Sequence, residues 1–258
     1  MSRGLFDIAG KVAFISGGSR GIGFMMASAY VEAGARVYIS ARKAEQCEAA
    51  AASLGARGEC IALPADLSRM DEIERVAAEL TARETALHVL INNAGTQWGA
   101  SVDAFPEKGW DKVLDLNLKS PFFLLQKLLP LLTAAAETDD PARVINVSSA
   151  DGMHTPIFDN FSYAASKAGL NHVSRMLAAH LAARHITVNV IAPGPFHTEM
   201  LAPMVDLMGA DTLLENVPLK RMGGADDAAG VAIFLAARAS AYITGAVLPL
   251  DGGLIGAS

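Results

Sequence analysis

The sequence predicts an α/β fold in which helices cover both faces of one mostly parallel, seven-stranded sheet. Three observations support this prediction: short apolar runs alternate with longer segments of helical periodicity, nearly every run is apolar on both faces, and no linker or shift in composition divides the chain. A strand that is covered by helices on both sides needs apolar residues at successive positions. The 258 residues are therefore expected to form one doubly wound domain, residues 1–258.

The short, β-rich apolar runs are the expected strands. They lie at 11–16, 36–40, 59–64, 87–92, 142–148, 185–192 and 246–252. The segments between them carry alanine, leucine and charged residues at a spacing near 3.6 residues, which predicts helices at 21–33, 43–54, 69–83, 109–133, 161–183 and 225–238. Alternation of strand and helix predicts right-handed crossovers between parallel strands.

Residues 195–224 break this alternation. The segment holds three prolines, four methionines and a glycine pair. Long connections without regular periodicity are often functional loops. We therefore expect a mobile flap at about 195–224 that covers a site.

The overall composition excludes several classes of protein. Hydrophobic residues make up 52% of the chain, yet no run of eighteen uncharged apolar residues occurs, so no membrane span is expected. The first residues show no targeting peptide, which favours a cytoplasmic location. A net charge of −6 argues against a nucleic-acid partner. Cys47 and Cys60 match no metal-ligand spacing, so two reduced structural thiols and no metal site are expected.

The first strand leads directly into a glycine-rich turn, "SGGSRGIG", at the start of a helix. Gly17, Gly21 and Gly23 allow a tight turn, a close backbone approach to a pyrophosphate and close packing of helix on strand. The helix N-terminus then faces the anion. The spacing is GxxxGxG, not GxGxxG, and a purely structural turn is the alternative. The position of the turn favours a Rossmann-type dinucleotide site.

The end of the second strand indicates which dinucleotide binds. An NAD site usually carries an acidic residue there for the ribose 2′-hydroxyl, whereas a 2′-phosphate needs a cation. Here Ala41 takes the place of the acid, Arg42 follows it, and Arg20 lies in the glycine turn. Two guanidinium groups and no carboxylate favour NADP(H). Two solvated surface arginines are the alternative.

Eight motifs in order resemble those of the short-chain dehydrogenase/reductase family, over essentially the whole chain. They are "SGGSRGIG" at 16–23, "ADLS" at 65–68, "NNAG" at 92–95, "LNLKS" at 116–120, "INVSS" at 145–149, "YAASK" at 163–167, "APG" at 192–194 and "YITGAVLPLDGG" at 242–253. The resemblance implies an oxidoreductase that transfers a hydride between a nicotinamide cofactor and a carbonyl or alcohol.

Tyr163 and Lys167 lie four residues apart, on one face of the expected helix. A free tyrosine has a pKa of about 10, and a nearby ammonium group is expected to lower it by stabilising the phenolate. Tyr163 could then act as the proton donor to a carbonyl oxygen or as the base in reverse. The resemblance implies that Lys167 also contacts the nicotinamide ribose.

Two further residues complete the expected catalytic group. Ser149 would orient the substrate oxygen, and Ser148 is the competing candidate. The position of Gly152 after it favours Ser149, although Ser149 and Tyr163 are separated by fourteen residues where many family members have thirteen. Asn117 is similar to the asparagine that kinks the long helix and holds a water linked to the lysine.

The resemblance also assigns the remaining cofactor contacts. Asp66 and Leu67 would flank the adenine, and the sequence "DGG" at 251–253 is expected to be a turn. The full set of cofactor-binding candidates is Gly17, Ser19, Arg20, Gly21, Ile22, Gly23, Arg42, Asp66, Leu67, Asn93, Ala94, Gly95, Tyr163, Lys167, Pro193, Gly194, Phe196 and Thr198.

The substrate is expected to be a small-molecule carbonyl compound. Methionines of the flap would suit a flexible apolar ligand, although they could equally pack the flap onto the core. Several stretches resemble bacterial 3-oxoacyl reductases, especially of the rhamnolipid-pathway type, which implies reduction of a 3-oxoacyl thioester by NADPH. The acidic loop "AAAETDDPAR" would repel an acidic carrier protein, while Arg184 remains as a basic contact.

Two other functions remain open. A sugar or polyol dehydrogenase of the same fold would need more polar groups around the site, and a silent NADP-sensing protein would not need Tyr163. The apolar faces of the helices at 109–133 and 161–183 favour a homo-oligomer, a dimer or a tetramer.

Overall fold

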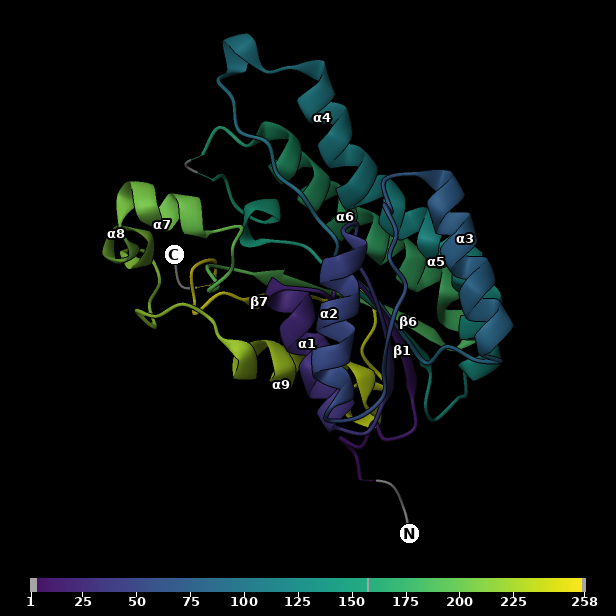
Figure 1. Cartoon of the computed structure of the whole chain (residues 1–258). Helices are drawn as coiled ribbons and strands as arrows, with labels where there is room; N and C mark the ends of the chain where they lie inside the picture. Colours follow the sequence, from purple (N-terminus) through teal and green to yellow (C-terminus); the bar gives the residue numbers. More distant parts are fainter. Residues whose placement is uncertain (1–3, 157, 257–258) are drawn as a thin grey trace.

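A computed structural model describes residues 4–156 and 158–256 and shows one sheet of seven parallel strands (Figure 1). The strand order is β3-β2-β1-β4-β5-β6-β7. The strands are β1 (Val12–Ser16), β2 (Arg36–Ser40), β3 (Cys60–Ala62), β4 (Val89–Asn92), β5 (Ala142–Val147), β6 (Ile186–Pro193) and β7 (Val247–Leu250). The predicted fold class is therefore confirmed, and each strand lies inside or within one residue of its predicted range.

Helices pack on both faces of this sheet, and each face has its own hydrophobic core. One core joins the sheet to α1 (Gly21–Glu32), α2 (Ala44–Gly55) and α9 (Ala225–Ala236). The other joins it to α3 (Met70–Arg83), α5 (Ser120–Ala135) and α6 (Phe161–Leu181). Both layers are visible in Figure 1.

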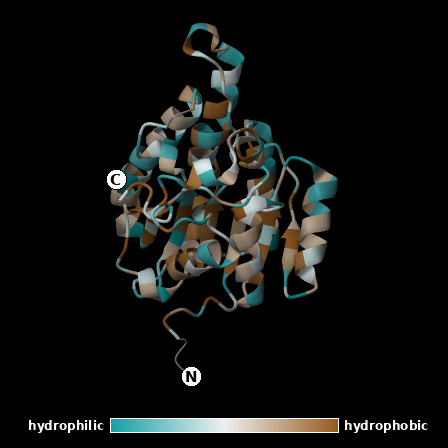
Figure 2. Cartoon of the chain, turned by 90° about the vertical axis from the view of Figure 1, so that its left-hand side faces the viewer, coloured by the Kyte–Doolittle hydropathy of each residue, from teal (hydrophilic) through white to brown (hydrophobic). Residues whose placement is uncertain are grey.

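Successive strand residues contribute to opposite cores. In β1, Ala13 and Ile15 pack in the first core, whereas Val12 and Phe14 pack in the second. All four are buried, as the side-chain alternation of a strand between two helical layers requires. Figure 2 shows the brown hydrophobic residues gathered on the interior strands.

The long helix predicted at 109–133 is three consecutive segments. Residues Glu107–Leu114 form α4, Asp115–Lys119 form a π-helical turn, and Ser120–Ala135 form α5. A π turn contains one more residue per turn than the α-helix around it and is frequent at functional sites. Asn117, in this π segment, is 1% exposed.

The predicted flap contains two short helices, α7 (Ala202–Met208) and α8 (Ala210–Leu214). The chain changes direction between them at Gly209, whose φ of 82° favours glycine. Neither helix contains a buried residue. In Figure 1 they stand to the left of the sheet, above α9.

The strand order reverses between β1 and β4. The chain proceeds from β1 to β2 on one side and returns to β4 on the other. In doubly wound sheets, ligands bind at such a switch point, beyond the carboxyl ends of the strands. A ligand-binding site is therefore expected at the carboxyl ends of β1 and β4.

At the opposite end of the sheet, where the strands begin, lies an ion-pair cluster. Asp140 pairs with Lys11 at 2.7 Å and with Arg143 at 3.2 Å. Of the acidic loop before β5, Asp140 is thus already paired, while Glu137 and Asp139 are exposed. Within the chain, this loop and Arg184 precede β5 and β6, away from the switch point.

Among the described residues, no helix is both long and apolar enough to cross a membrane. Nor do residues 4–156 and 158–256 contain a cluster of three or more histidine, cysteine or acidic side chains that could hold a metal.

Candidate active site

The glycine turn lies against the loop that follows β4. A Cβ atom added to Gly17, whose φ is +67°, would lie 2.8 Å from Asn93 Nδ2, and one added to Gly23 would lie 2.3 Å from the same atom. Asn93 Nδ2 donates to the carbonyls of Ser16 and Gly17 at 3.0 and 3.1 Å. Only glycine at these two positions lets Asn93 lie so close to the turn. The Asn93 side chain holds the turn in place, and its backbone borders the switch point.

Ser16 joins the same two segments and was missed in the sequence. Its Oγ accepts hydrogen bonds from the backbone N–H groups of Asn93 and Ala94, both at 3.0 Å. A second such link joins Asn92 and Asn146, which are in register on β4 and β5, by an Nδ2 to Oδ1 bond of 2.8 Å. Ser16 and Asn92 are polar residues that end apolar strands, and this pattern in the sequence could have indicated their role.

The N-terminus of α1 can hold an anion. Arg20 is its N-cap residue, and no side chain caps the first turn, which includes Gly21, Ile22 and Gly23. The free N–H groups of a helix N-terminus attract phosphate. Ser19 is half-buried in the turn and Arg20 is exposed.

The two candidate arginines differ in their partners. Arg20 forms an ion pair with Glu199 of the flap. Arg42, exposed just beyond β2, has no ion-pair partner among the described residues. One guanidinium thus lies just beyond β2 and the other in the glycine turn, and the prediction that both bind a phosphate remains a prediction.

Not every candidate cofactor-binding residue presents its side chain to the switch point. Leu67 is 3% exposed and packs in the core with α3, so only its backbone could face an adenine. Asp66 accepts hydrogen bonds from the backbone and hydroxyl of Ser68 at 3.2 and 2.7 Å. Its carboxylate is therefore already engaged in a local turn.

The candidates after β6 also divide into two groups. Phe196 is 3% exposed, and its ring packs on Gly223, where an added Cβ would lie 2.4 Å from it. Its side chain is thus a core element. Pro193 ends β6, and Gly194 donates to Leu250 at 3.1 Å. Thr198 lies beside Gly21, since a Cβ added there would be 3.4 Å from Thr198 Cγ2.

Tyr163 and Lys167 occupy one face of α6, as predicted. Lys167 Nζ lies over the tyrosine ring, 5.6 Å from its centroid, and donates to the carbonyl of Val147 at 2.8 Å. Lys167 is 4% exposed. The ammonium group therefore lies on the face of the tyrosine ring, and its hydrogen bond goes to the backbone.

The expected lowering of the Tyr163 pKa is wrong for this arrangement. Burial raises the pKa of Tyr163 to about 12; the Ser149 hydroxyl opposes this shift and the Asp151 carboxylate adds to it. Burial also lowers the pKa of Lys167 to about 8. The physical reason is that removal from water disfavours the charged form of each group. Tyr163 is thereby kept protonated near neutral pH.

The structure distinguishes Ser149 from Ser148. The Ser148 hydroxyl is buried and donates to the carbonyl of Lys167 at 3.1 Å. The Ser149 hydroxyl interacts with the Tyr163 phenol and accepts from the backbone N–H of Asp151 at 3.1 Å. Only Ser149 therefore offers its hydroxyl on the side of Tyr163.

The loop between Ser149 and Tyr163 is tied to the start of α6. Asn160 donates to the carboxylate of Asp151 at 2.8 Å, and Asn171 donates to the carbonyl of Gly152 at 3.1 Å. A Cβ at Gly152 would lie 2.9 Å from Lys167 Cβ, so glycine is needed there. These contacts hold the first part of the fourteen-residue interval against α6.

Asn117 connects the π segment to two other parts of the site. Its Oδ1 accepts from Thr96 N at 2.9 Å, while its Nδ2 donates to Thr96 O at 2.9 Å and to Ser166 Oγ at 3.0 Å. A Cβ added to Gly95 would lie 3.5 Å from Asn117 Oδ1 and 3.6 Å from Lys167 Nζ. Gly95 therefore links the glycine-turn region to the Tyr163 region, so that both belong to one site.

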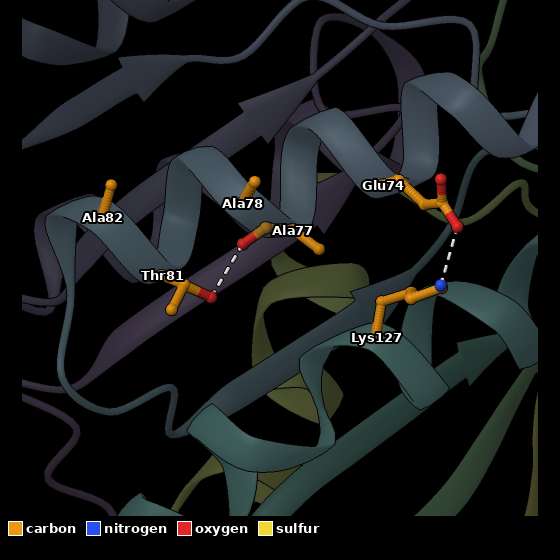
Figure 3. A pocket seen from close by; sticks show the side chains of 6 residues that line it. All are labelled: Glu74, Ala77, Ala78, Thr81, Ala82 and Lys127. Atoms are coloured by element: carbon orange, nitrogen blue, oxygen red, sulfur yellow. Dashed lines mark hydrogen bonds and ion pairs between the residues drawn. The ribbon is translucent and has the colours of Figure 1, made fainter.

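A separate hollow lies between α3 and α5 (Figure 3). It is lined by Glu74, Ala77, Ala78, Thr81, Ala82 and Lys127, and Lys127 bridges it to Glu74 at 2.7 Å. None of the candidate site residues lines this hollow.

Comparison with known proteins identifies the family. A family model described as enoyl-(acyl carrier protein) reductase matches residues 17–255, which is nearly the whole chain. A relative from Pseudomonas aeruginosa, described as a rhamnolipids biosynthesis 3-oxoacyl-[acyl-carrier-protein] reductase, is 46% identical over 96% of this chain and 97% of its own length. The chain belongs to the short-chain dehydrogenase/reductase family of oxidoreductases, as its motifs indicated.

Solved structures agree with this assignment. The structure described as the Pseudomonas aeruginosa RhlG/NADP active-site complex matches with a TM-score of 0.94 and 45% identity, over 97% of this chain and 98% of that chain. A structure of a putative NAD(P)-dependent gluconate 5-dehydrogenase from Beutenbergia cavernae, with bound NADP, matches with a TM-score of 0.92 and 31% identity, over 99% of this chain and 100% of that one.

Proposed function

We propose that this protein is an NADPH-dependent carbonyl reductase that converts a 3-oxoacyl thioester, or a related lipophilic ketone, into a secondary alcohol. The observation that carries the proposal is the meeting of the glycine turn with Ser149, Tyr163 and Lys167 across Gly95. The Pseudomonas aeruginosa relative, described as a 3-oxoacyl reductase, and the RhlG/NADP complex support the substrate class and the cofactor.

The site residues fit NADP(H). The uncapped N-terminus of α1 would receive the diphosphate, and the glycines at 17 and 23 let the turn pack closely against Asn93. Arg42, with no ion-pair partner among residues 4–156 and 158–256, would receive the 2′-phosphate together with Arg20. The reduced nicotinamide, when bound, supplies the hydride.

The chain's own residues would bind and protonate the substrate oxygen. The Ser149 hydroxyl would donate a hydrogen bond to the carbonyl oxygen and so favour charge developing there. The phenol of Tyr163, which is protonated near neutral pH because its pKa is about 12, would give its proton to that oxygen. The Lys167 ammonium would stabilise the phenolate left behind.

A substrate panel tests this proposal. NADPH oxidation is followed by absorbance with acetoacetyl-CoA, a lipophilic diketone and a ketose in parallel. We expect turnover of one of the first two. Turnover of the ketose alone would instead favour a sugar or polyol dehydrogenase, the second candidate, which the similarity to a gluconate 5-dehydrogenase structure supports. No turnover at all would favour an NADP-sensing protein.

Replacement of the proton donor tests the chemistry directly. In the Tyr163→Phe variant, we expect turnover to be abolished while NADPH affinity stays within about threefold, because the phenol oxygen acts in the chemical step. Fluorescence titration of NADPH and steady-state kinetics measure the two quantities. A variant that keeps a substantial rate would remove Tyr163 from its proposed role.

A further inference from the structure

The two ends of the flap lie side by side at the body of the protein. Phe196 and Gly223 form an isolated β-bridge there, and Gly223 N donates to Pro195 O at 2.9 Å. Beyond this bridge, α7 and α8 contain no buried residue. Val217, after α8, is buried near Gly252 and anchors the end of the flap, while Glu199 and Met200 at its start make polar contacts with the body of the protein.

The first residues of the flap reach back to the glycine turn. They follow β6, which lies three strands from β1 in the sheet. Glu199 nevertheless pairs with Arg20, and Gln97 Nε2 donates to Met200 O at 3.4 Å. Thr198 lies beside Gly21. The base of the flap thus contacts the segment where a dinucleotide would bind.

The ion pair between Arg20 and Glu199 is accessible to a competitor. The two side chains are 59% and 66% exposed. An exposed ion pair contributes little to stability, whereas a doubly charged phosphate can form stronger, bidentate bonds with a guanidinium. A phosphate that reaches Arg20 would therefore displace the carboxylate.

We propose that Glu199 is a cofactor-selectivity residue, whose carboxylate competes with the adenosine 2′-phosphate of NADP(H) for the Arg20 guanidinium. The inference rests on the proposed function in that the nucleotide binds at the glycine turn. NAD(H) has no 2′-phosphate and leaves the pair intact. Glu199 thus weakens the binding of NADP(H) but not of NAD(H), and so reduces the preference for NADP(H) that the arginines create.

The Glu199→Gln variant tests this competition. Isothermal titration calorimetry with NADP⁺ and with NAD⁺ gives the two dissociation constants. We expect NADP⁺ to bind about two- to fivefold more tightly, which is the range of an exposed ion pair, and NAD⁺ to bind as in the original protein. The matched control is Asp206→Asn, which removes the same charge from an exposed position of the flap; its NADP⁺ affinity should not change.

Repeating the measurement in the Arg20→Met variant tests whether Arg20 is the group for which Glu199 and the 2′-phosphate compete. There, Glu199→Gln should no longer alter NADP⁺ affinity, because no guanidinium remains to be shared. Three results would overturn the inference if NADP⁺ still binds to the original protein. They are an equal gain in affinity for both nucleotides, a gain in NADP⁺ affinity that persists in the Arg20→Met background, and no gain in affinity at all. Failure of the original protein to bind NADP⁺ would overturn the proposed function as well.

Discussion

Two adjacent serines have different environments at the end of β5. Ser148 is directed into the protein, where its hydroxyl holds the carbonyl of Lys167. Ser149 faces the phenol of Tyr163. Since neighbouring residues of an extended chain point in opposite directions, only one of two consecutive serines can serve the substrate.

Paired alanine substitutions test this division. We expect Ser149→Ala to lower kcat about 10²- to 10³-fold, the usual loss for an oxyanion donor, and to reduce the free energy of unfolding by about 1 kcal/mol because the bond from the Asp151 N–H is lost. Ser148→Ala should leave kcat within a few-fold and reduce the free energy of unfolding by about 1 kcal/mol, because a buried hydrogen bond is lost. Steady-state kinetics and urea unfolding measure both. The reverse pattern would make Ser148 the substrate-orienting residue.

Lys167 reduces stability in order to serve the site. Its pKa falls from 10.5 to about 8 because burial disfavours the ammonium form. Below pH 8 the lysine is protonated in the folded and the unfolded chain, so the full cost of burying the charge is present. Between about pH 8 and 10.5 the unfolded chain binds more protons, and stability should rise with pH.

Replacement of Lys167 by methionine should separate stability from activity. At pH 7 we expect a gain of about 2 kcal/mol in the free energy of unfolding, which is the relieved burial cost less one lost hydrogen bond. The variant should be inactive, and its stability should lack the rise above pH 8. Urea unfolding at pH 7 and pH 9.5 measures both effects. A variant less stable than the original at pH 7 would contradict the burial argument.

At the scale of elements, the π turn connects the helical layer to the site. Asn117 satisfies both backbone groups of Thr96, a residue outside any helix or strand, and also bonds Ser166 on α6. One amide group therefore holds together three segments that are distant in sequence.

Replacement of Asn117 by leucine should uncouple these segments. We expect a loss of about 3 kcal/mol of unfolding free energy, because the half-buried backbone groups of Thr96 and the buried hydroxyl of Ser166 would lose their partner. The control is Lys119→Ala in the same π segment, which removes an exposed ion pair with Asp115 and should cost less than about 0.5 kcal/mol. Thermal and urea unfolding measure both variants. Equal losses would show that the segment is sensitive to any change.

The elements were largely predictable from the sequence, and their interruptions were not. Apolar runs specified the seven strands because burial on both faces leaves a local pattern. The π turn depends on contacts of Asn117 with Thr96 and Ser166, which no periodicity encodes. Likewise, the motifs gave the positions of Leu67 and Phe196, but their burial in the two cores depends on packing partners that are distant in the chain.

The electrostatics of the site were the least predictable part. The spacing of Tyr163 and Lys167 correctly placed both on one face of α6. The direction of the Tyr163 pKa shift depends on how much protein surrounds the pair, and the sequence contains no measure of that burial. Ser16 escaped notice for a similar reason, since its two backbone partners belong to another strand.

At the scale of the whole molecule, the layer of α5 and α6 exposes large apolar side chains. Phe122 on α5 is 38% exposed and Met176 on α6 is 52% exposed. Exposed apolar groups on helices often mark a contact between subunits. We propose that the protein is a homo-oligomer that assembles through this layer.

Charges placed on this layer should disrupt the assembly. We expect the double variant Phe122→Glu, Met176→Glu to sediment as a smaller species than the original protein, because the contact would bury unpaired carboxylates. The control is Leu207→Glu on the flap, where the side chain is 78% exposed. It should leave the sedimentation coefficient unchanged. A monomeric original protein, or an unchanged double variant, would exclude this face.

The π turn is also the one place in this helix where the chain length can change without disturbing the layer. A π turn holds one residue more than an α turn, so one residue fewer between Asp115 and Lys119 would let the segment close as an α turn and leave α5 in nearly the same orientation. The leucine ridge of that helix, Leu124, Leu128, Leu131 and Leu132, would still face the sheet. A deletion there should therefore spare the helical layer and instead move Asn117 away from Thr96 and Ser166.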